Sequence, residues 1–391
     1  MCRLIVFTCA AALALVVVAP AQPSKPAPAK ADGLLDLNQQ WSRGKAEGKG
    51  AVRLTHSPMR LEDIERIIPS GLMVGGHVTP IDHQYYYPRG DKACDVFAPA
   101  DGFVVMIGHR VQLSGSTEKK RDYDDFALHI EHTGTFYTFY DLLTELDPAV
   151  LKPLDDETRK RFADKKQGPP VHARIPVKAG QVVGKVRGRS LDFALINAET
   201  RLKGLLTPKL YGHYAWRVHV VDPFDYFDEP LKGKLLKLNE RTTEPRGGKI
   251  DYDVDERLVG NWFKEGTNGY VGTRDPKGYW LGHLAVVYHH LDTDKVIVSV
   301  GDFDGRPRQF GVKGNGPDPA KVSKDEGAVK YELINPTRPS SAKPFEGADG
   351  TVQGVLVVQV LDGRKLKVEV FPGKTAKDVT GFTKAASVYE R

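Results

Sequence analysis

The chain has 391 residues, a formal net charge of +6 and three cysteines. This length exceeds what a single hydrophobic core usually organises, so two domains are expected. The positive excess is small and the charges are interspersed, which argues against a nucleic-acid partner and suits an anionic cell wall at least as well.

The first residues have the pattern of a secretory signal peptide. Arg3 precedes an apolar run over residues 4–18, and Ala19-Pro20-Ala21 supplies an A-x-A cleavage site. We therefore predict a signal peptide at residues 1–21 and an exported protein, periplasmic or extracellular. The run is too short to span a bilayer, and no later segment reaches about 20 apolar residues, so no membrane-spanning segment is expected. Cleavage would leave Cys94 as the only thiol, which excludes a Cys zinc site.

The pattern after the cleavage site predicts a mostly β first domain. A Pro/Ala/Lys-rich tether and lead-in occupy residues 22–56, and the domain is placed at residues 57–235. Apolar residues at helical spacing over 61–68 predict a short helix. Thr133-Gly134 between two β-rich runs predicts a hairpin, and residues 147–170 read as a charged, Pro-rich insertion with weak helical character.

A second composition change separates a C-terminal domain. Residues 236–250 are a predicted linker, and residues 251–391 hold eight or nine short strands between Gly, Asp and Pro turns. This spacing predicts an antiparallel barrel or sandwich. The segment Leu258-Val259-Gly260-Asn261-Trp262 is similar to the G-x-W opening of lipocalin-like barrels. A small barrel of that kind suits an apolar ligand.

The first domain contains six short motifs that follow one another along the chain. They are Gly75-Gly76-His77 with Asp82, the strand turn at 95–104, Ile130-Glu131-His132-Thr133-Gly134, Tyr140-Asp141-Leu142-Leu143, the turn at 177–184, and Ser190-Leu191-Asp192-Phe193. Over residues 70–228 this order resembles the lysostaphin-like (LytM-type) zinc endopeptidases, which cut peptidoglycan peptide cross-links. The resemblance implies a mainly β fold: a lysostaphin-like antiparallel sheet domain of the duplicated hybrid motif type, followed by the C-terminal antiparallel β-barrel.

The resemblance also implies metal ligands at His77, Asp82 and Asp192, the last in place of a histidine. Zn²⁺ accepts both donor types, and the added carboxylate would admit another divalent metal such as Mn²⁺. The family spaces its His and Asp four apart, on one face of an extended strand, whereas His77 and Asp82 are five apart. Either a bulge near Pro80 restores the facing, or His83 is the ligand instead.

The positions of the family's two catalytic histidines read Leu142 and Ser190. Leucine cannot accept a proton, and serine is a poor base without a partner. Asp141, beside Leu142, or a displaced histidine, for which we take His132, would have to serve as the base.

Three functions are therefore open. The first is an exported cell-envelope protein that recognises peptidoglycan or a partner cell-wall hydrolase with weak or no hydrolysis. The second is an active zinc metalloendopeptidase acting on peptidoglycan peptide cross-links, and the third is a β-barrel protein that carries a small ligand. The first is favoured because both base positions are lost.

Overall fold

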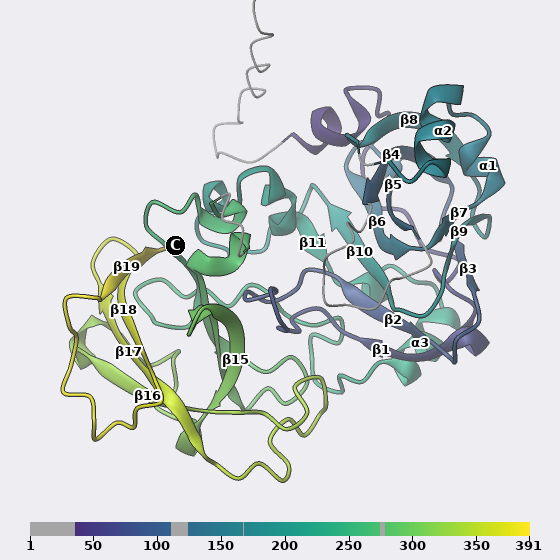
Figure 1. Cartoon of the computed structure of the whole chain (residues 1–391). Helices are drawn as coiled ribbons and strands as arrows, with labels where there is room; N and C mark the ends of the chain where they lie inside the picture. The colour runs from purple at the N-terminus through teal and green to yellow at the C-terminus, as the bar shows by residue number, and fades with distance from the viewer. Residues whose placement is uncertain (1–35, 111–123, 167, 274–277) are drawn as a thin grey trace, which may run out of the picture.

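The computed structural model describes residues 36–110, 124–166, 168–273 and 278–391 (Figure 1). The predicted signal peptide and residues 22–35 of the predicted tether and lead-in lie outside these ranges. The chain is mainly β and ends in a closed antiparallel barrel, as the sequence predicted. Figure 1 shows the barrel strands β15–β19 gathered on one side of the molecule and strands β1–β10 on the other. Within the described ranges, no helix has the length and apolar character needed to cross a membrane.

The first region is built on an eight-stranded antiparallel sheet. Its strands run in the order β1-β2-β10-β6-β5-β4-β8, and β11 pairs with β10. The bounds are β1 Ile64–Ile68, β2 Gln84–Pro88, β4 Gly102–Arg110, β5 Asp125–Thr133, β6 Phe136–Leu143, β8 Val171–Val177, β10 Leu191–Asn197 and β11 Val220–Val221. The predicted hairpin at Thr133-Gly134 is confirmed, because it joins β5 to β6.

Alternation along the strands gives this sheet two different faces. Leu191, Phe193 and Leu195 of β10 enter the core of the first region. That core also contains residues of a second, three-stranded sheet in the order β3-β9-β7, with β3 Cys94–Phe97, β7 Glu145–Leu146 and β9 Val182–Val186. The alternate residues of β10, Asp192 and Ala194, point to the opposite face because successive side chains in a strand alternate. We call the first face the core face and the second the site face.

Helices are short in this region. The insertion at 147–170 forms α1 (Pro148–Leu151) and α2 (Asp156–Ala163), each with an aspartate side chain capping its first turn. Helix α3 (Leu231–Leu238) packs against β1. The helix expected over residues 61–68 is wrong: a single 3₁₀ turn, η2 (Leu61–Asp63), leads into strand β1. The isoleucines that mimic helical spacing are β-branched, and a register shift between Ile64 and Arg66 lets Ile64 and Ile67 enter the same core, while Ile68 is buried in a separate cluster.

The C-terminal region is an eight-stranded barrel closed by pairing of β12 with β19. Its bounds are β12 Gly260–Lys264, β13 His283–Tyr288, β14 Val296–Phe303, β15 Arg306–Val312, β16 Val329–Ile334, β17 Val352–Leu361, β18 Lys365–Pro372 and β19 Ser387–Glu390. Trp262 is fully buried, its indole N–H donates to the Leu258 carbonyl, and the Arg391 guanidinium lies 4.0 Å from its ring centroid. Trp262 belongs to a cluster of buried apolar residues that draws on the barrel strands. The predicted apolar ligand stays a prediction.

Candidate functional site

The segment that carries the first predicted ligands is a loop. Gly75 adopts a φ of 54°, which glycine tolerates, and the His77 amide donates to the Val74 carbonyl across the resulting turn. The expectation of an extended strand through His77 and Asp82 is therefore wrong. Because the segment is a loop, strand alternation does not decide which side chains at this five-residue spacing share a face. The loop instead delivers Asp82 and His83 directly to the start of β2.

Four side chains form a buried ion network on the site face. The His83 Nδ1 lies 2.8 Å from Asp82 Oδ1, and its Nε2 lies 3.2 Å from Asp192 Oδ2. The Arg217 Nε lies 3.0 Å from the other Asp82 oxygen, while its Nη2 donates to the Pro80 carbonyl. The Arg217 side chain is only 4% exposed and that of Asp192 only 7%. We call Asp82, His83, Asp192 and Arg217 the ion network.

The network is balanced in charge. Burial alone would lower the pKa of the His83 imidazole, but Asp192 and Asp82 outweigh it and raise that pKa to about 10. Burial alone would raise the pKa of the Asp82 carboxyl, but Arg217 and His83 outweigh it and hold that pKa well below its usual range. Two carboxylates thus face one imidazolium and one guanidinium. Removing one member would leave an uncompensated charge in a buried site, which is strongly destabilising.

These contacts do not fit a metal ion. An ionised carboxylate only accepts hydrogen bonds, so a histidine with both nitrogens at carboxylates carries both protons and has no lone pair for a metal. Both oxygens of Asp82 face cations. Within the described ranges Asp192 Oδ1, His83 Nε2 and Arg217 Nε make no hydrogen bond, so His83 Nε2 and Arg217 Nε meet their carboxylates as ion pairs. The exposed His77 ring stands 6.5 Å from the His83 ring.

The remaining donors fall short of a zinc site. His77 and Asp192 Oδ1 offer fewer than the three protein ligands of a catalytic zinc site. In agreement, no group of three or more His, Cys, Asp or Glu side chains in the described part of the chain is placed to hold a metal. In this arrangement the positive charge that Zn²⁺ would supply comes from His83 and Arg217.

Arg217 reaches the network from a distant segment. It lies in the 3₁₀ stretch η3 (Pro208–His219), and its guanidinium stacks 4.2 Å from the Tyr270 ring in the loop after β12. Gln309 of β15 exchanges two hydrogen bonds with the Gly75 backbone, at 3.0 and 3.1 Å. A side chain added at Gly76 would collide with the ring of Trp280. The C-terminal region therefore packs directly over the loop that carries His77.

Asp141, the first predicted base, does lie beside the network. It sits directly opposite Asp192 in the β6–β10 ladder, where like charges repel. Burial raises the pKa of its carboxyl, while Arg110, which hydrogen-bonds to it and to Asp125, opposes that rise. Each aspartate of the pair thus has its own cation, and the Asp141 carboxylate already has a strong partner. A base that is engaged in this way is poorly placed to take a proton from water.

The two positions that match the family's catalytic histidines flank this pair. Leu142 has a φ of 67°, unusual for a residue with a side chain, and its amide donates to Asp141 Oδ1 at 2.8 Å. Ser190 is buried immediately before β10. Neither side chain supplies a proton acceptor of suitable pKa, so the structure adds no base at these positions.

His132, the second predicted base, lies away from the network. Its Nδ1 is 2.8 Å from the Asp101 carbonyl oxygen and its Nε2 is 3.1 Å from the Thr138 hydroxyl. Thr138 precedes Asp141 by three residues in β6, so the two side chains are on opposite faces and about 10 Å apart along the strand. Burial lowers the pKa of His132 to about 4. The structure therefore does not bring His132 and Asp141 into one site.

Sequence reasoning missed Arg217 and Arg110, the cations that complete the site. Arg217 stands in the apolar stretch Ala215-Trp216-Arg217-Val218, and an arginine in such a stretch is rarely buried without a partner. That signal identifies a buried ion pair but not its carboxylate, because Asp82 is 135 residues earlier in the chain.

Comparison with known proteins leaves the family open. No family model and no curated protein matches the chain. Among solved structures, it is similar to the SpoIIQ-SpoIIIAH pore-forming complex, with 15% identity, a TM-score of 0.25, and coverage of 47% of this chain and 96% of that one. A zinc-containing peptidase from Vibrio cholerae shows 18% identity, a TM-score of 0.20 and coverage of 37% of each chain. The solution structure of lysostaphin shows 14% identity, a TM-score of 0.24, and coverage of 66% and 91%.

Proposed function

We propose that this chain is an exported cell-envelope protein whose first region binds peptidoglycan with weak or no hydrolysis. The ion network is the observation that supports this proposal. Both oxygens of Asp82 and Oδ2 of Asp192, which the resemblance would assign to a metal, face His83 and Arg217 instead. Leu142 and Ser190, which occupy the positions of the family's catalytic histidines, also favour weak or no hydrolysis. General acid–base catalysis typically raises a reaction rate 10²–10⁴-fold, and neither residue can supply it.

The choice of peptidoglycan rests on the sequence. The ordered motifs over residues 70–228 resemble enzymes that act on this polymer, the predicted signal peptide would export the chain, and a charge of +6 suits an anionic wall. A partner cell-wall hydrolase is the alternative occupant of the same surface.

Pelleting with insoluble peptidoglycan tests the proposal. Purified mature chain should sediment with the polymer and saturate, and new amino termini should not accumulate in the pellet. Release of new amino termini that a chelator abolishes would establish the zinc endopeptidase instead. A chain that stays in the supernatant would contradict direct binding and leave recognition of a hydrolase to be tested with that enzyme.

A further inference from the structure

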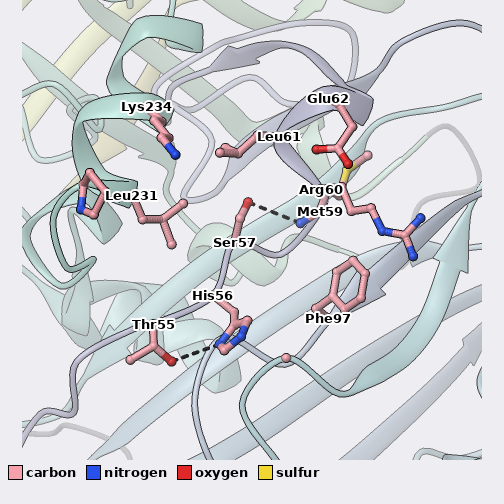
Figure 2. Close-up of a pocket in the computed structure, with 12 residues that line it drawn as sticks. Thr55, His56, Ser57, Met59, Arg60, Leu61, Glu62, Phe97, Leu231 and Lys234 are labelled. Atoms are coloured by element: carbon pink, nitrogen blue, oxygen red, sulfur yellow. Dashed lines mark hydrogen bonds between the residues drawn. The ribbon is translucent and has the colours of Figure 1, made fainter.

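A separate pocket opens on the outer side of the three-stranded sheet (Figure 2). It is surrounded by residues 55–57 and 59–62, Phe97 of β3, Gly180 of the β8–β9 turn and the first turn of α3. Its volume of about 370 Å³ is within the range of small-molecule sites. Val96 enters the core and its neighbour Phe97 faces outward, so the core of the first region separates this pocket from the ion network.

The floor of the pocket is apolar and fixed. Met59 is fully buried, and Leu61, Phe97 and Leu231 are half-buried around it. The Arg60 guanidinium lies 5.5 Å from the Phe97 ring centroid and pairs with Asp95 at 2.9 Å. Because Asp95 already compensates this charge, the pocket presents a surface for a small apolar side chain and no free charge at that edge.

Two charges of opposite sign stand on the rim without a partner. Lys234 of α3 and Glu62 of η2 are both exposed, and neither side chain makes a hydrogen bond or an ion pair within the described ranges. Figure 2 shows them on either side of Leu61. A ligand that meets both must carry an anionic and a cationic group, joined by a part that tolerates the apolar floor.

We propose that this pocket binds a short peptide with free termini. The peptide carboxylate faces Lys234, its ammonium group faces Glu62, and a small apolar side chain rests on Leu61 and Phe97. The pocket would recognise free peptide independently of any binding on the site face.

Titration of the full mature chain with the dipeptide alanyl-leucine, followed by calorimetry or amide chemical shifts, tests this proposal. We expect saturable binding that N-acetylation or C-amidation of the dipeptide weakens. Exposed charge pairs contribute modestly, so Lys234→Glu and Glu62→Lys should each weaken binding by about threefold or more, since each also introduces repulsion. The double exchange of both residues should restore binding, because the zwitterion can then lie in the reverse direction.

Matched controls separate this effect from a general change in charge. Lys237 lies on the same helix as Lys234, and Glu65 lies on β1; both are exposed and outside the pocket. The control variants Lys237→Glu and Glu65→Lys should therefore leave the affinity for the dipeptide unchanged. Leu61→Asp should abolish binding while thermal unfolding shows a folded chain. Equal affinity for the blocked dipeptide, absence of saturable binding, or single exchanges without effect would overturn the proposal. Because no peptidoglycan is present, failure here is distinguishable from failure of the pelleting experiment.

Discussion

The two faces of the large sheet hold histidines in opposite charge states. On the core face His132 contacts a carbonyl and a hydroxyl, and burial lowers its pKa to about 4. At the edge of the site face His83 lies between two carboxylates, and its pKa is raised to about 10 despite burial. The partners of a histidine, not its presence in a motif, thus decide whether it is a base, a cation or a metal ligand.

Breaking the ion network should have the largest effect. Arg217→Met removes the cation from Asp82 and leaves a buried carboxylate beside His83 alone, which should cost about 3–5 kcal/mol of unfolding free energy in urea titrations. The double variant Arg217→Met with Asp82→Asn should recover part of this loss, because the buried charge is gone. Equal stability of Arg217→Met and wild type would show that the network does not form.

A core-face substitution in β10 provides the apolar counterpart. Leu195 is fully buried, so Leu195→Ala should cost about 2–5 kcal/mol, measured in the same titrations. This loss should be independent of pH between 6 and 10, whereas the loss in Arg217→Met should grow as His83 deprotonates, because Asp82 then keeps no cation. Parallel pH behaviour in the two variants would contradict the distinction between the faces.

Alkaline titration should isolate His83. Its folded pKa is raised above its ordinary value of 6.5, so its stabilising contribution is complete below pH 6.5 and is lost as the pH rises to about 10. His83→Gln should remove this decline, which denaturation midpoints at pH 6, 8 and 10 would measure. A decline of the same size in the variant would assign it to other groups.

For His132, the contribution to folding stability should fall as the pH is lowered, which is the opposite pH dependence to that of His83, and the change should be smaller. Its folded pKa is lowered, so its contribution is present above pH 6.5 and is lost as the pH falls to about 4. His132→Gln should flatten this limb and, at neutral pH, cost about 1 kcal/mol through its hydrogen bonds. If the variant keeps the full acid limb, His132 is not the group responsible.

Much of the fold was predictable because its signals are local. Alternation and the Thr133-Gly134 turn predict the β5–β6 hairpin, and short strands between turns predict the barrel. The isoleucines of 61–68 misled because a short apolar run satisfies helical spacing by chance, while β-branching and a bulge place it in β1.

The site was only partly predictable. Asp82 and Asp192, which the resemblance implied, do meet at His83, the alternative that the spacing raised, but their partner Arg217 arrives through the irregular η3 stretch. No periodicity in the sequence encodes that approach. The loop conformation at Gly75 also depends on contacts with Gln309 of the barrel, which a motif in the first region cannot report.

Zinc content tests the central claim most directly. Mature wild-type chain incubated with excess Zn²⁺ and then desalted should retain no stoichiometric zinc by elemental analysis, because Arg217 and His83 already neutralise the carboxylates. One zinc per chain, lost in Asp192→Ala and His77→Ala, would contradict the account and restore the metal site.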